Sequence, residues 1–226
     1  MTKIFAILSL IFLLSCSSTK NMLVKKYQDE RIKLTTDSGI IILKLYDKTP
    51  LHRDNFIKLV NQHYFDSLLF HRVIKNFMIQ GGDPESKHAK PGDALGNGGP
   101  PYTIPAEFDT SLFHKRGVIA AARDGDDVNP SKASSASQFY IVQGKIFTDT
   151  GLDSVEKFRL KRKIPAWQRE IYKTVGGTPH LDMNYTVFGE VESGMEVVDK
   201  IAATITGDND RPLQDIRMKI ELIVVN

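Results

Sequence analysis

One segment, residues 70–83 (FHRVIKNFMIQGGD), constrains the fold of this chain more than any other. It begins as a strand, runs through an apolar stretch and stops at a Gly-Gly-Asp turn. Arg72 lies inside the apolar run, where a buried cation is costly unless it is paired. Gln80 follows Met78 by two residues, so both side chains share one face of an extended chain. An arginine, a methionine and a glutamine on one wall are compatible with a chemical site. The alternative is a hydrophobic hairpin with one arginine at its rim.

Strand-like segments recur through the rest of the chain. Residues 31–36 and 39–46 are expected to be strands around an Asp37-Ser38-Gly39 turn. Because strands recur without βαβ alternation, the pattern favours a mainly β fold, a closed antiparallel barrel. The other expected strands are 117–122, 137–142, 186–191 and 218–225, with a short extended piece at 103–108.

The strand at 137–142 is expected to carry both core and cleft residues. Gln138 and Tyr140 share one face and are expected to line the same cleft as Gln80. Phe139 and Ile141 share the other face and are expected in the core.

Two helices are expected to accompany the strands. Thr49 and Pro50 predict the start of a helix over residues 51–62, with the threonine as cap and the proline in the first turn. A second helix is expected over residues 194–202. His52 and His63 are expected to be solvated at the surface, because no competing ligand spacing is present.

Residues 147–178 interrupt the strand pattern. Apolar residues recur at helical spacing in two groups, divided by Pro165 near the start of the second group. They predict two short amphipathic helices inserted between core strands. The basic run Lys161-Arg162-Lys163 is expected to be a solvated corner, and its alternative is contact with anionic lipid or a partner. The apolar residues are Leu152, Val155, Phe158, Ile164, Trp167, Ile171 and Val175.

Composition limits the classes of function. With 226 residues and 41% hydrophobic residues, the chain is long and apolar enough for one folded domain. A net charge of +3 is too small to indicate a nucleic-acid partner, and none is predicted. Asp124, Asp126 and Asp127 lie close together but do not fit the EF-hand calcium pattern, and His88 has no ligand spacing. No metal site and no cofactor are predicted.

The N-terminus has the features of a secretory signal. Lys3 precedes an apolar run over residues 4–14, which is too short to span a bilayer comfortably as a helix. Ser15 and Cys16 follow, and Cys16 is the only cysteine of the chain, so an internal disulfide is ruled out.

The tetrapeptide ending at Cys16 (LLSC) resembles the cleavage site of bacterial lipoproteins. The resemblance implies a signal peptide over residues 1–15, a lipid on Cys16 and a flexible tether over residues 16–30. It also implies an extracytoplasmic chain anchored to the cell envelope. Ser17 favours the periplasmic side of the outer membrane. The alternative is an ordinary cleaved signal with a chance cysteine.

The string FHRVIKNFMIQGGD resembles the signature of the cyclophilins, which are peptidyl-prolyl cis-trans isomerases. Later segments repeat the resemblance in the family's order and extend it from about Lys33 to Val225. It implies an isomerase domain over residues 31–226: an eight-stranded antiparallel β-barrel capped by two α-helices, with residues 147–178 as a helical insertion. The later segments are TIPAEF (103–108), GVIAAA (117–122), SQFYIV (137–142) and LDMNYTVFGEV (181–191).

The resemblance assigns roles to individual residues. Arg72 matches the catalytic arginine, and Phe77, Met78 and Leu181 match residues that line the proline pocket. Gln80 matches the glutamine that binds the substrate backbone and helps to place the arginine.

Two further matches lie along the substrate groove. Ala122 and Gln138 match positions for the residue that precedes proline. The implied partners are proline-containing polypeptides and, through Cys16, a membrane. The chain is expected to be a monomer.

Four further positions, all expected to contact substrate, depart from the family pattern. Tyr140 replaces a common pocket phenylalanine, so its hydroxyl needs a partner or a water. Tyr185 stands where many members have a histidine. His180 stands where members that bind cyclosporin tightly have tryptophan, which predicts weak inhibition by that drug. Arg123 replaces an asparagine whose backbone contacts substrate, and its charge is expected to alter sequence preference.

The expected function is therefore isomerisation of X–Pro bonds during folding of exported proteins. The peptide bond turns against a barrier of about 18–20 kcal/mol, and no bond has to break. A fixed arginine suits the twisted amide, because its N–H donors can stabilise the exposed nitrogen lone pair. One alternative is a non-catalytic cyclophilin-like module that binds proline-containing segments in the cell envelope. Another is a membrane-tethered assembly factor that works through the helical insertion.

Overall fold

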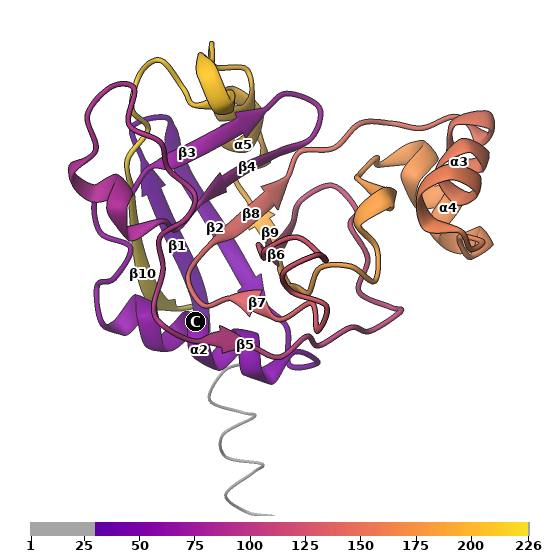
Figure 1. Cartoon of the computed structure of the whole chain (residues 1–226), viewed down its shortest axis with the longest axis horizontal. Coiled ribbons are helices and arrows are strands. Elements are labelled where there is room, and N and C mark those ends of the chain that lie inside the picture. Colours follow the sequence, from indigo (N-terminus) through magenta and orange to yellow (C-terminus); the bar gives the residue numbers. More distant parts are fainter. Residues whose placement is uncertain (1–29, 226) are drawn as a thin grey trace, which may run out of the picture.

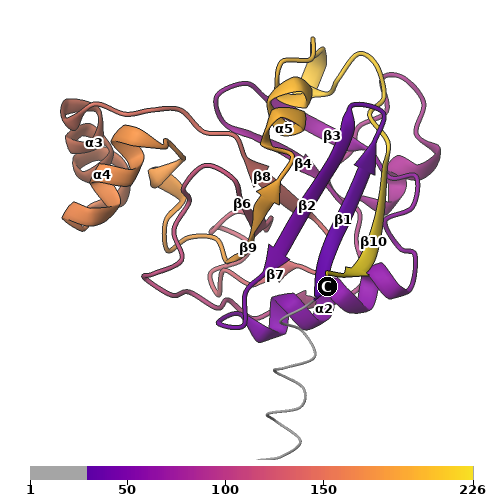
Figure 2. The same cartoon turned by 180° about the vertical axis from the view of Figure 1, so that it is seen from behind.

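The computed structural model describes residues 30–225, so the predicted signal peptide and Cys16 lie outside the described residues. Eight strands form one antiparallel sheet in the order β10-β1-β2-β9-β6-β8-β4-β3 (Figures 1 and 2). They are β1 (Glu30–Thr36), β2 (Gly39–Leu45), β3 (Phe70–Ile74), β4 (Met78–Gly81), β6 (Val118–Ala121), β8 (Phe139–Val142), β9 (Val187–Ser193) and β10 (Met218–Val224). A separate short ladder joins β5 (Thr103–Ile104) to β7 (Ser134–Ser135).

The sheet curls until its two edge strands meet. Just before β3, the Ser67 N–H donates to the Met218 carbonyl at 2.9 Å, and the Met218 N–H donates to the Leu68 carbonyl at 2.8 Å. Leu69 and Arg217 form an additional antiparallel bridge. The prediction of a mainly β fold built on an eight-stranded antiparallel barrel is therefore confirmed. Closure also protects the sheet edges from pairing with other chains.

The main hydrophobic core fills the inside of the curled sheet. Alternate strand residues point into it, such as Ile32 and Leu34 of β1, as the period of two requires. Helix α2 (Pro50–Asn61) covers one end of the barrel and α5 (Met195–Ala202) the other (Figure 1). Both expected capping helices are thus present. Their buried contributions are Phe56, Leu59 and Val60 from α2, and Val197, Val198, Ile201 and Ala202 from α5.

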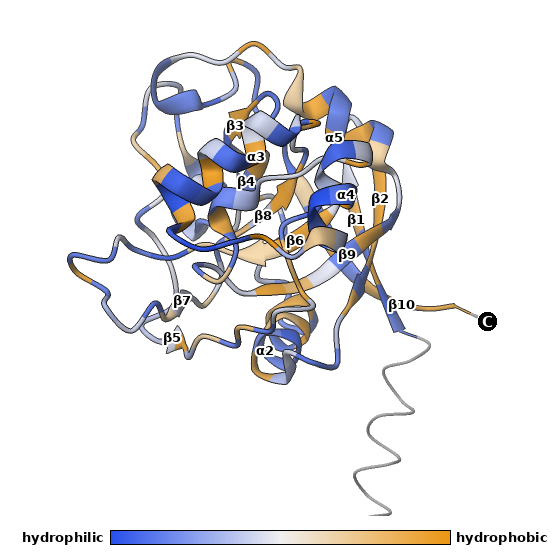
Figure 3. Ribbon diagram, turned by 90° about the vertical axis from the view of Figure 1, so that its right-hand side faces the viewer, coloured by the Kyte–Doolittle hydropathy of each residue, from blue (hydrophilic) through white to orange (hydrophobic). Residues whose placement is uncertain are grey.

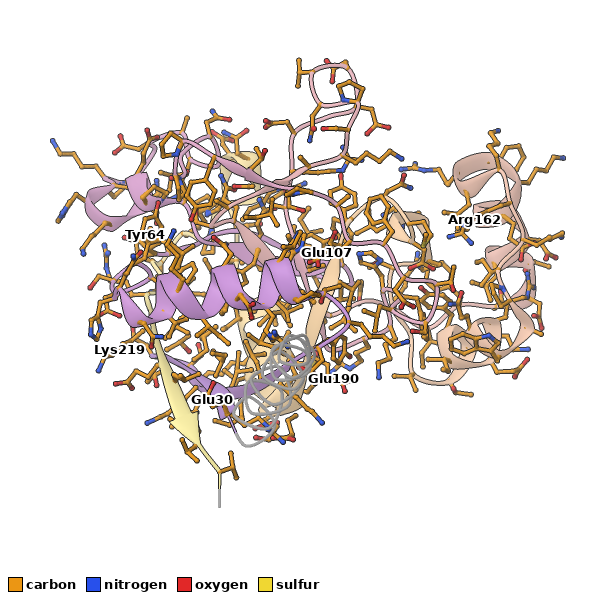
Figure 4. The ribbon with its side chains drawn as sticks, turned by 90° about the horizontal axis from the view of Figure 1, so that it is seen from below. Glu30, Tyr64, Glu107, Arg162, Glu190 and Lys219 are labelled. Atoms are coloured by element: carbon orange, nitrogen blue, oxygen red, sulfur yellow. The ribbon has the colours of Figure 1, made fainter. Side chains whose placement is uncertain are left out.

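The start of α2 differs from the prediction. Thr49 occupies the N-cap position, but its side chain makes no capping hydrogen bond. Glu107 replaces it from a distant loop, accepting from the backbone N–H groups of Leu51 and His52 at 3.0 Å each (Figure 4). A carboxylate is favoured there because the first N–H groups of a helix carry partial positive charge.

His52 was expected at the surface, and this prediction was wrong. Its side chain is buried, with Nδ1 2.7 Å from the Glu107 carboxylate and Nε2 2.9 Å from the Ser134 hydroxyl. The residue next to the helix start is drawn inward because one carboxylate binds both the helix end and the imidazole. His63, by contrast, is exposed as expected.

The insertion forms a helical unit beside the barrel (Figure 2). Helix α3 (Asp149–Val155) continues into a π-helical turn, η2 (Glu156–Leu160), and α4 (Ala166–Thr174) follows after Pro165. The predicted helical insertion is therefore present. It has its own small core, which Phe113 of the main domain joins: Phe113, Leu152, Ile164 and Tyr172.

The apolar pattern of the insertion misidentified part of its buried face. Phe158 and Trp167 were expected on it, but their exposed fractions are 62% and 50%. The π-helical turn after Val155 rotates the later side chains away from the face that α3 buries. In α4 the buried positions are Gln168 and Tyr172, one helical turn apart. Figure 3 shows hydrophobic residues along the central strands β4, β6 and β8, and hydrophilic residues over much of α4.

Three short 3₁₀-helices complete the described part of the chain. They are η1 (Pro84–His88), η3 (Pro179–Leu181) and η4 (Asp208–Asp210). No helix among residues 30–225 is long and apolar enough to cross a membrane.

Candidate functional site

The strand register places the central polar residues in one row on the outside of the barrel. Arg72 of β3 lies opposite Gln80 of β4, Gln80 lies opposite Tyr140 of β8, and Tyr140 lies opposite Ala120 of β6. Phe139, on the other face of β8, points into the main core. Phe139 in the core and Tyr140 on the outer face therefore agree with the expected division of this strand.

A second apolar cluster supports this outer face. Met78, Tyr140 and Val187 are buried in it, and Phe77 and Leu181 pack against it. A cavity of about 160 Å³ opens above the cluster, small compared with the pockets of roughly 300–1,000 Å³ that hold drug-sized ligands. Nine of the eleven candidate residues line it: Arg72, Phe77, Met78, Gln80, Ala122, Arg123, Tyr140, Leu181 and Tyr185.

Arg72 is only partly buried and is paired with a carboxylate. Its Nε lies 3.3 Å from Asp210 Oδ2, and the two side chains are 42% and 44% exposed. Within residues 30–225 the guanidinium makes no other hydrogen bond or ion pair, so its Nη donors remain available to a ligand in the cavity. Asp210 is held in the left-handed backbone region, with φ +59°.

Gln138 does not line this cavity, although it contacts a residue that does. The Gln80 Nε2 donates to the Gln138 Oε1 at 3.3 Å. The Gln138 Nε2 in turn donates to the carbonyls of Gly96 and Gly98 at 2.8 and 2.9 Å. Gln138 therefore joins the central row to a glycine-rich loop.

Asp83 fixes the same loop and was not among the predicted site residues. Its buried carboxylate accepts hydrogen bonds from the backbone N–H groups of Glu85, Gly96 and Gly98. A Cβ on Gly98 would lie 2.3 Å from Asp83 Oδ1, so the close approach requires glycine. The Gly-Gly-Asp turn of the sequence was the available signal for this role.

The buried Tyr140 hydroxyl has a hydrogen-bond partner, as expected for a tyrosine in the place of the family's phenylalanine. It lies 3.0 Å from His114 Nε2, and His114 Nδ1 lies 3.0 Å from Asp182 Oδ1. The Tyr172 hydroxyl donates to Asp182 Oδ2 at 2.7 Å. All four side chains are buried, so they form a continuous polar chain from the cavity floor to helix α4. Burial, followed by the charges near it, raises the pKa of Tyr140 well above its usual value and keeps the hydroxyl protonated.

The partners in this chain of hydrogen bonds were not predicted from the sequence. His114 and Asp182 are 68 residues apart, and neither lies in a motif with ligand spacing. The hydroxyl of Tyr140 was the only signal, because a buried hydroxyl needs a partner.

Arg123 is immobilised against the cavity wall. Its Nε donates to the Asn184 carbonyl at 2.7 Å, and its guanidinium lies 4.6 Å from the centre of the Tyr185 ring. Asp126 pairs with it at 2.6 Å, which offsets its charge locally. The side chain is only 4% exposed. Arg123 thus forms part of the wall rather than a free cation at the cavity mouth.

His180 also lies outside the small cavity. Its ring packs on Phe77, with centroids 5.5 Å apart and an interplanar angle of 31°. Burial, and after it the positive charge of Arg159, lowers the pKa of His180 to about 4. The ring is therefore neutral near pH 7 and presents a flat, weakly polar surface.

A larger cavity of about 960 Å³ lies on the other side of Arg72 and Gln80. The loops at residues 91–96 and 207–215 supply most of its walls. The two cavities share Arg72 and Gln80, so an extended chain bound in one passes close to the other. Among residues 30–225, no group of three His, Cys, Asp or Glu side chains is arranged to hold a metal ion.

Most of the chain is similar to proteins of one known family. Residues 31–221 match the family model described as cyclophilin type peptidyl-prolyl cis-trans isomerase/CLD. A relative from Staphylococcus epidermidis, named for peptidyl-prolyl cis-trans isomerase activity, is 34% identical over 198 residues, which are 85% of this chain and 91% of the relative. A similarly named protein from Staphylococcus aureus is 33% identical over the same shares.

A longer relative and a solved structure extend the comparison. A Streptococcus pyogenes protein named as a bifunctional phosphatase/peptidyl-prolyl cis-trans isomerase is 32% identical, and the chain covers only 38% of its length. The cyclophilin type peptidyl-prolyl cis-trans isomerase of Cryptosporidium parvum has a TM-score of 0.61 at 21% identity, covering 87% of this chain and 98% of that one. It supports the fold. With the family model over most of the chain and relatives above 30% identity, this chain belongs to the cyclophilin-type peptidyl-prolyl cis-trans isomerase family.

Proposed function

We propose that this protein accelerates cis-trans rotation of X–Pro bonds in exported polypeptides, with Arg72 as the main catalytic residue. The observation that carries the proposal is the small cavity in which the Arg72 guanidinium faces an apolar wall of Phe77, Met78 and Leu181. An apolar wall of this size suits a proline ring, and the cation beside it suits the amide that has to turn.

The proposed mechanism requires no covalent step. As the amide twists, conjugation is lost and the nitrogen lone pair becomes a hydrogen-bond acceptor. The Nη donors of Arg72 would bind that nitrogen better in the twisted state than in either planar state, which lowers the barrier. A 10⁵-fold acceleration needs about 7 kcal/mol of such differential binding. Preorganised donors supply it because they need no reorientation during the reaction.

The remaining candidate residues would hold the polypeptide while the bond turns. Gln80 would bind the substrate backbone, and Gln138, joined to Gln80, would border the groove for the residue that precedes proline. Ala122 and Arg123 form the adjoining wall, where a fixed arginine limits which side chains fit. Tyr140 and Tyr185 complete the cavity, and their rings pack edge to face at 5.9 Å.

The test is prolyl exchange in a short Ala-Pro peptide, measured by NMR with the purified protein and its Arg72→Ala variant. We expect fast exchange that collapses in the variant, because alanine leaves no donor for the amide nitrogen. Fast exchange in both proteins would retain the enzyme but move the chemistry to another residue. Peptide binding without acceleration would contradict catalysis and favour the binding-module alternative. The Asp210 carboxylate beside Arg72 makes that alternative worth testing, because it partly neutralises the cation.

The proposed location rests on the N-terminal sequence. The short apolar run and the tetrapeptide LLSC support export, cleavage before Cys16 and lipidation of its sulfur. Mass spectrometry of the mature protein should find residue 16 as the first residue, with a mass increase for the lipid. A Cys16→Ser variant should lose the lipid and leave the membrane fraction. An unmodified N-terminus at another position would contradict lipid anchoring.

A further inference from the structure

A third cavity adjoins the candidate site on the side of the insertion. Its volume is about 490 Å³, and it is lined by residues 74–77, Lys145, Phe147, Val155, Arg159, Gly177, Thr178 and His180. These residues define what we call the insert groove. Phe77 lines both the insert groove and the small cavity of about 160 Å³, and its ring packs at a tilt on that of His180, which lines the insert groove. The insert groove therefore begins where the candidate proline pocket ends.

The insert groove is positively charged. Lys75, Lys145 and Arg159 line it, and no aspartate or glutamate of residues 30–225 does. Within the described chain, none of these three cations lies within 4.0 Å of a carboxylate, whereas three of the six other basic residues of the insertion, Lys163, Arg169 and Lys173, are paired. Lys163 pairs with Glu156, and Arg169 bridges three carboxylates.

The groove also has apolar surface between its cations. The Lys145 ammonium lies 5.4 Å from the centre of the Phe147 ring, and Phe77 and Val155 form further apolar wall. Such a surface accepts the backbone and methylene groups of a polypeptide while the cations remain in reach of its charged side chains. Its composition fits an extended acidic segment better than a compact anion.

The order of residues along β4 indicates which part of a substrate would reach the groove. Gln80 faces Gln138 and the Gly96 loop, which border the groove for the residue before proline. Met78 lies two residues nearer the β3–β4 turn, and Phe77 lies in that turn. A chain that passes from Gln138 across Met78 therefore continues beyond Phe77 into the insert groove.

We propose that the insert groove binds acidic residues that follow the proline of a substrate, so that the insertion selects X–Pro bonds with acidic C-terminal flanks. This inference rests on the proposed isomerase function. It gives the insertion a role in substrate choice that the barrel alone does not supply.

The test compares two peptides, Ala-Ala-Pro-Phe-Asp-Asp-Asp and its Asn-Asn-Asn counterpart, with the full chain. We expect kcat/KM to be about tenfold higher for the acidic peptide at low salt, since exposed ion pairs are individually weak but three act together. The advantage should shrink at about 0.5 M NaCl, where screening shortens the range of the charges. A peptide with the three aspartates before Ala-Pro should gain much less.

Charge-reversal variants test whether the cations of the insert groove cause the preference for the acidic peptide. A Lys145→Glu/Arg159→Glu variant should lower the acidic-to-neutral ratio of kcat/KM to about one or below. The matched control is Lys157→Glu/Lys161→Glu, which makes the same charge change on exposed residues of the insertion outside the groove. This control variant should retain most of the acidic-to-neutral ratio of kcat/KM. Equal kcat/KM values for the two peptides, or an equal loss in both variants, would overturn the proposal.

Direct binding separates this proposal from the proposed catalysis. Fluorescence anisotropy of the labelled acidic peptide reports the groove even if no peptide is isomerised. Tighter binding of the acidic peptide that is lost in Lys145→Glu/Arg159→Glu would support the groove while the isomerase function failed. Groove-dependent binding to vesicles of anionic phospholipid, with no preference for the acidic peptide, would overturn it in favour of membrane contact.

Discussion

The position of the Arg72 side chain depends on one neighbouring residue, Asp210. The Asp210 carboxylate accepts a hydrogen bond from Nε at 3.3 Å, and we expect this contact to hold the guanidinium beside the cavity. The ion pair partly neutralises the positive charge of Arg72 while it restricts the orientation of the guanidinium. Because both side chains are more than 40% exposed, the pair contributes little to folding stability.

An Asp210→Asn variant should therefore lower kcat/KM for an Ala-Pro peptide about two- to fivefold, mainly through kcat. The amide weakens the hold on Nε and lets the guanidinium leave its productive orientation. Steady-state kinetics at several peptide concentrations separate kcat from KM. Asp208→Asn, in the same 3₁₀ turn but without a bond to Arg72, is the matched control. A rise in kcat/KM would show instead that Asp210 restrains the arginine.

Tyr140→Phe tests the buried hydrogen-bond chain. The variant keeps the aromatic wall but leaves the Nε2 of buried His114 without the Tyr140 hydroxyl. The free energy of unfolding should fall by about 1–3 kcal/mol, as expected for an unsatisfied buried polar group. Urea denaturation measures it. In a double-mutant cycle with Tyr172→Phe, the two effects should be non-additive because both hydroxyls belong to one network. Strict additivity would contradict the network.

At the scale of elements, the insertion is held together by charge as much as by its small core. Arg169 of α4 reaches Asp149 and Asp153 of α3 and Glu156 of the π-helical turn, at 2.8–3.0 Å. Glu156 is only 4% exposed, and burial alone would raise its pKa. Hydrogen bonds from Lys163, the Ile164 N–H and Arg169 outweigh burial and lower the pKa of Glu156 to about 2. Arg169 therefore joins both helices of the insertion at one point.

We expect Arg169→Leu to loosen the insertion while the barrel stays intact. A buried carboxylate that loses a partner is costly, so amide exchange in α3, η2 and α4 should accelerate about tenfold or more. Hydrogen exchange measured by mass spectrometry resolves these segments from β1 and β2. Lys173→Leu removes a cation whose partners among residues 30–225 are the exposed carboxylates of Asp149 and Glu170, and should have a smaller effect. Equal acceleration in the barrel strands would contradict a separate unit.

Much of the element pattern was predictable because it rests on local periodicity. The alternation along 137–142 placed Phe139 in the core and Tyr140 on the outer face, and the helices over 50–61 and 195–202 follow from their spacing. What local pattern could not supply were partners distant in sequence. Glu107 at the start of α2 and His114 under Tyr140 are such cases, since their positions depend on how the loops cross the finished barrel.

At the scale of the whole molecule, the barrel and the insertion contribute different surfaces to the region around Arg72 and Phe77. The barrel fixes the row Arg72–Gln80–Tyr140 by strand register, while the insertion adds charged surface next to Phe77. The buried chain from Tyr140 to Tyr172 connects the two parts physically. A change in the insertion can therefore reach the cavity floor without altering any residue that lines the cavity.

The stability of the whole molecule should depend on pH through its buried histidines. Burial lowers the pKa of His71 and of His180 to about 4, from an ordinary value of 6.5, and it also lowers that of His52. The unfolded chain then binds more protons than the folded one between about pH 6.5 and 4. The stability that comes from keeping these rings neutral is thus complete above about pH 6.5 and is lost as the pH falls toward 4.

His71 allows this effect to be isolated, because its side chain is only 4% exposed and phenylalanine has a similar shape without a titrating group. Between pH 6.5 and 4.5, His71→Phe should reduce the loss of unfolding free energy by roughly 2 kcal/mol relative to the wild-type protein. Carboxylates with lowered pKa values contribute little in this window, because they titrate below it. Urea denaturation at several pH values measures the slope, and an NMR titration of the His71 ring follows the same proton directly. An unchanged slope in His71→Phe, with the ring titrating near pH 6.5, would show that His71 is not the group responsible.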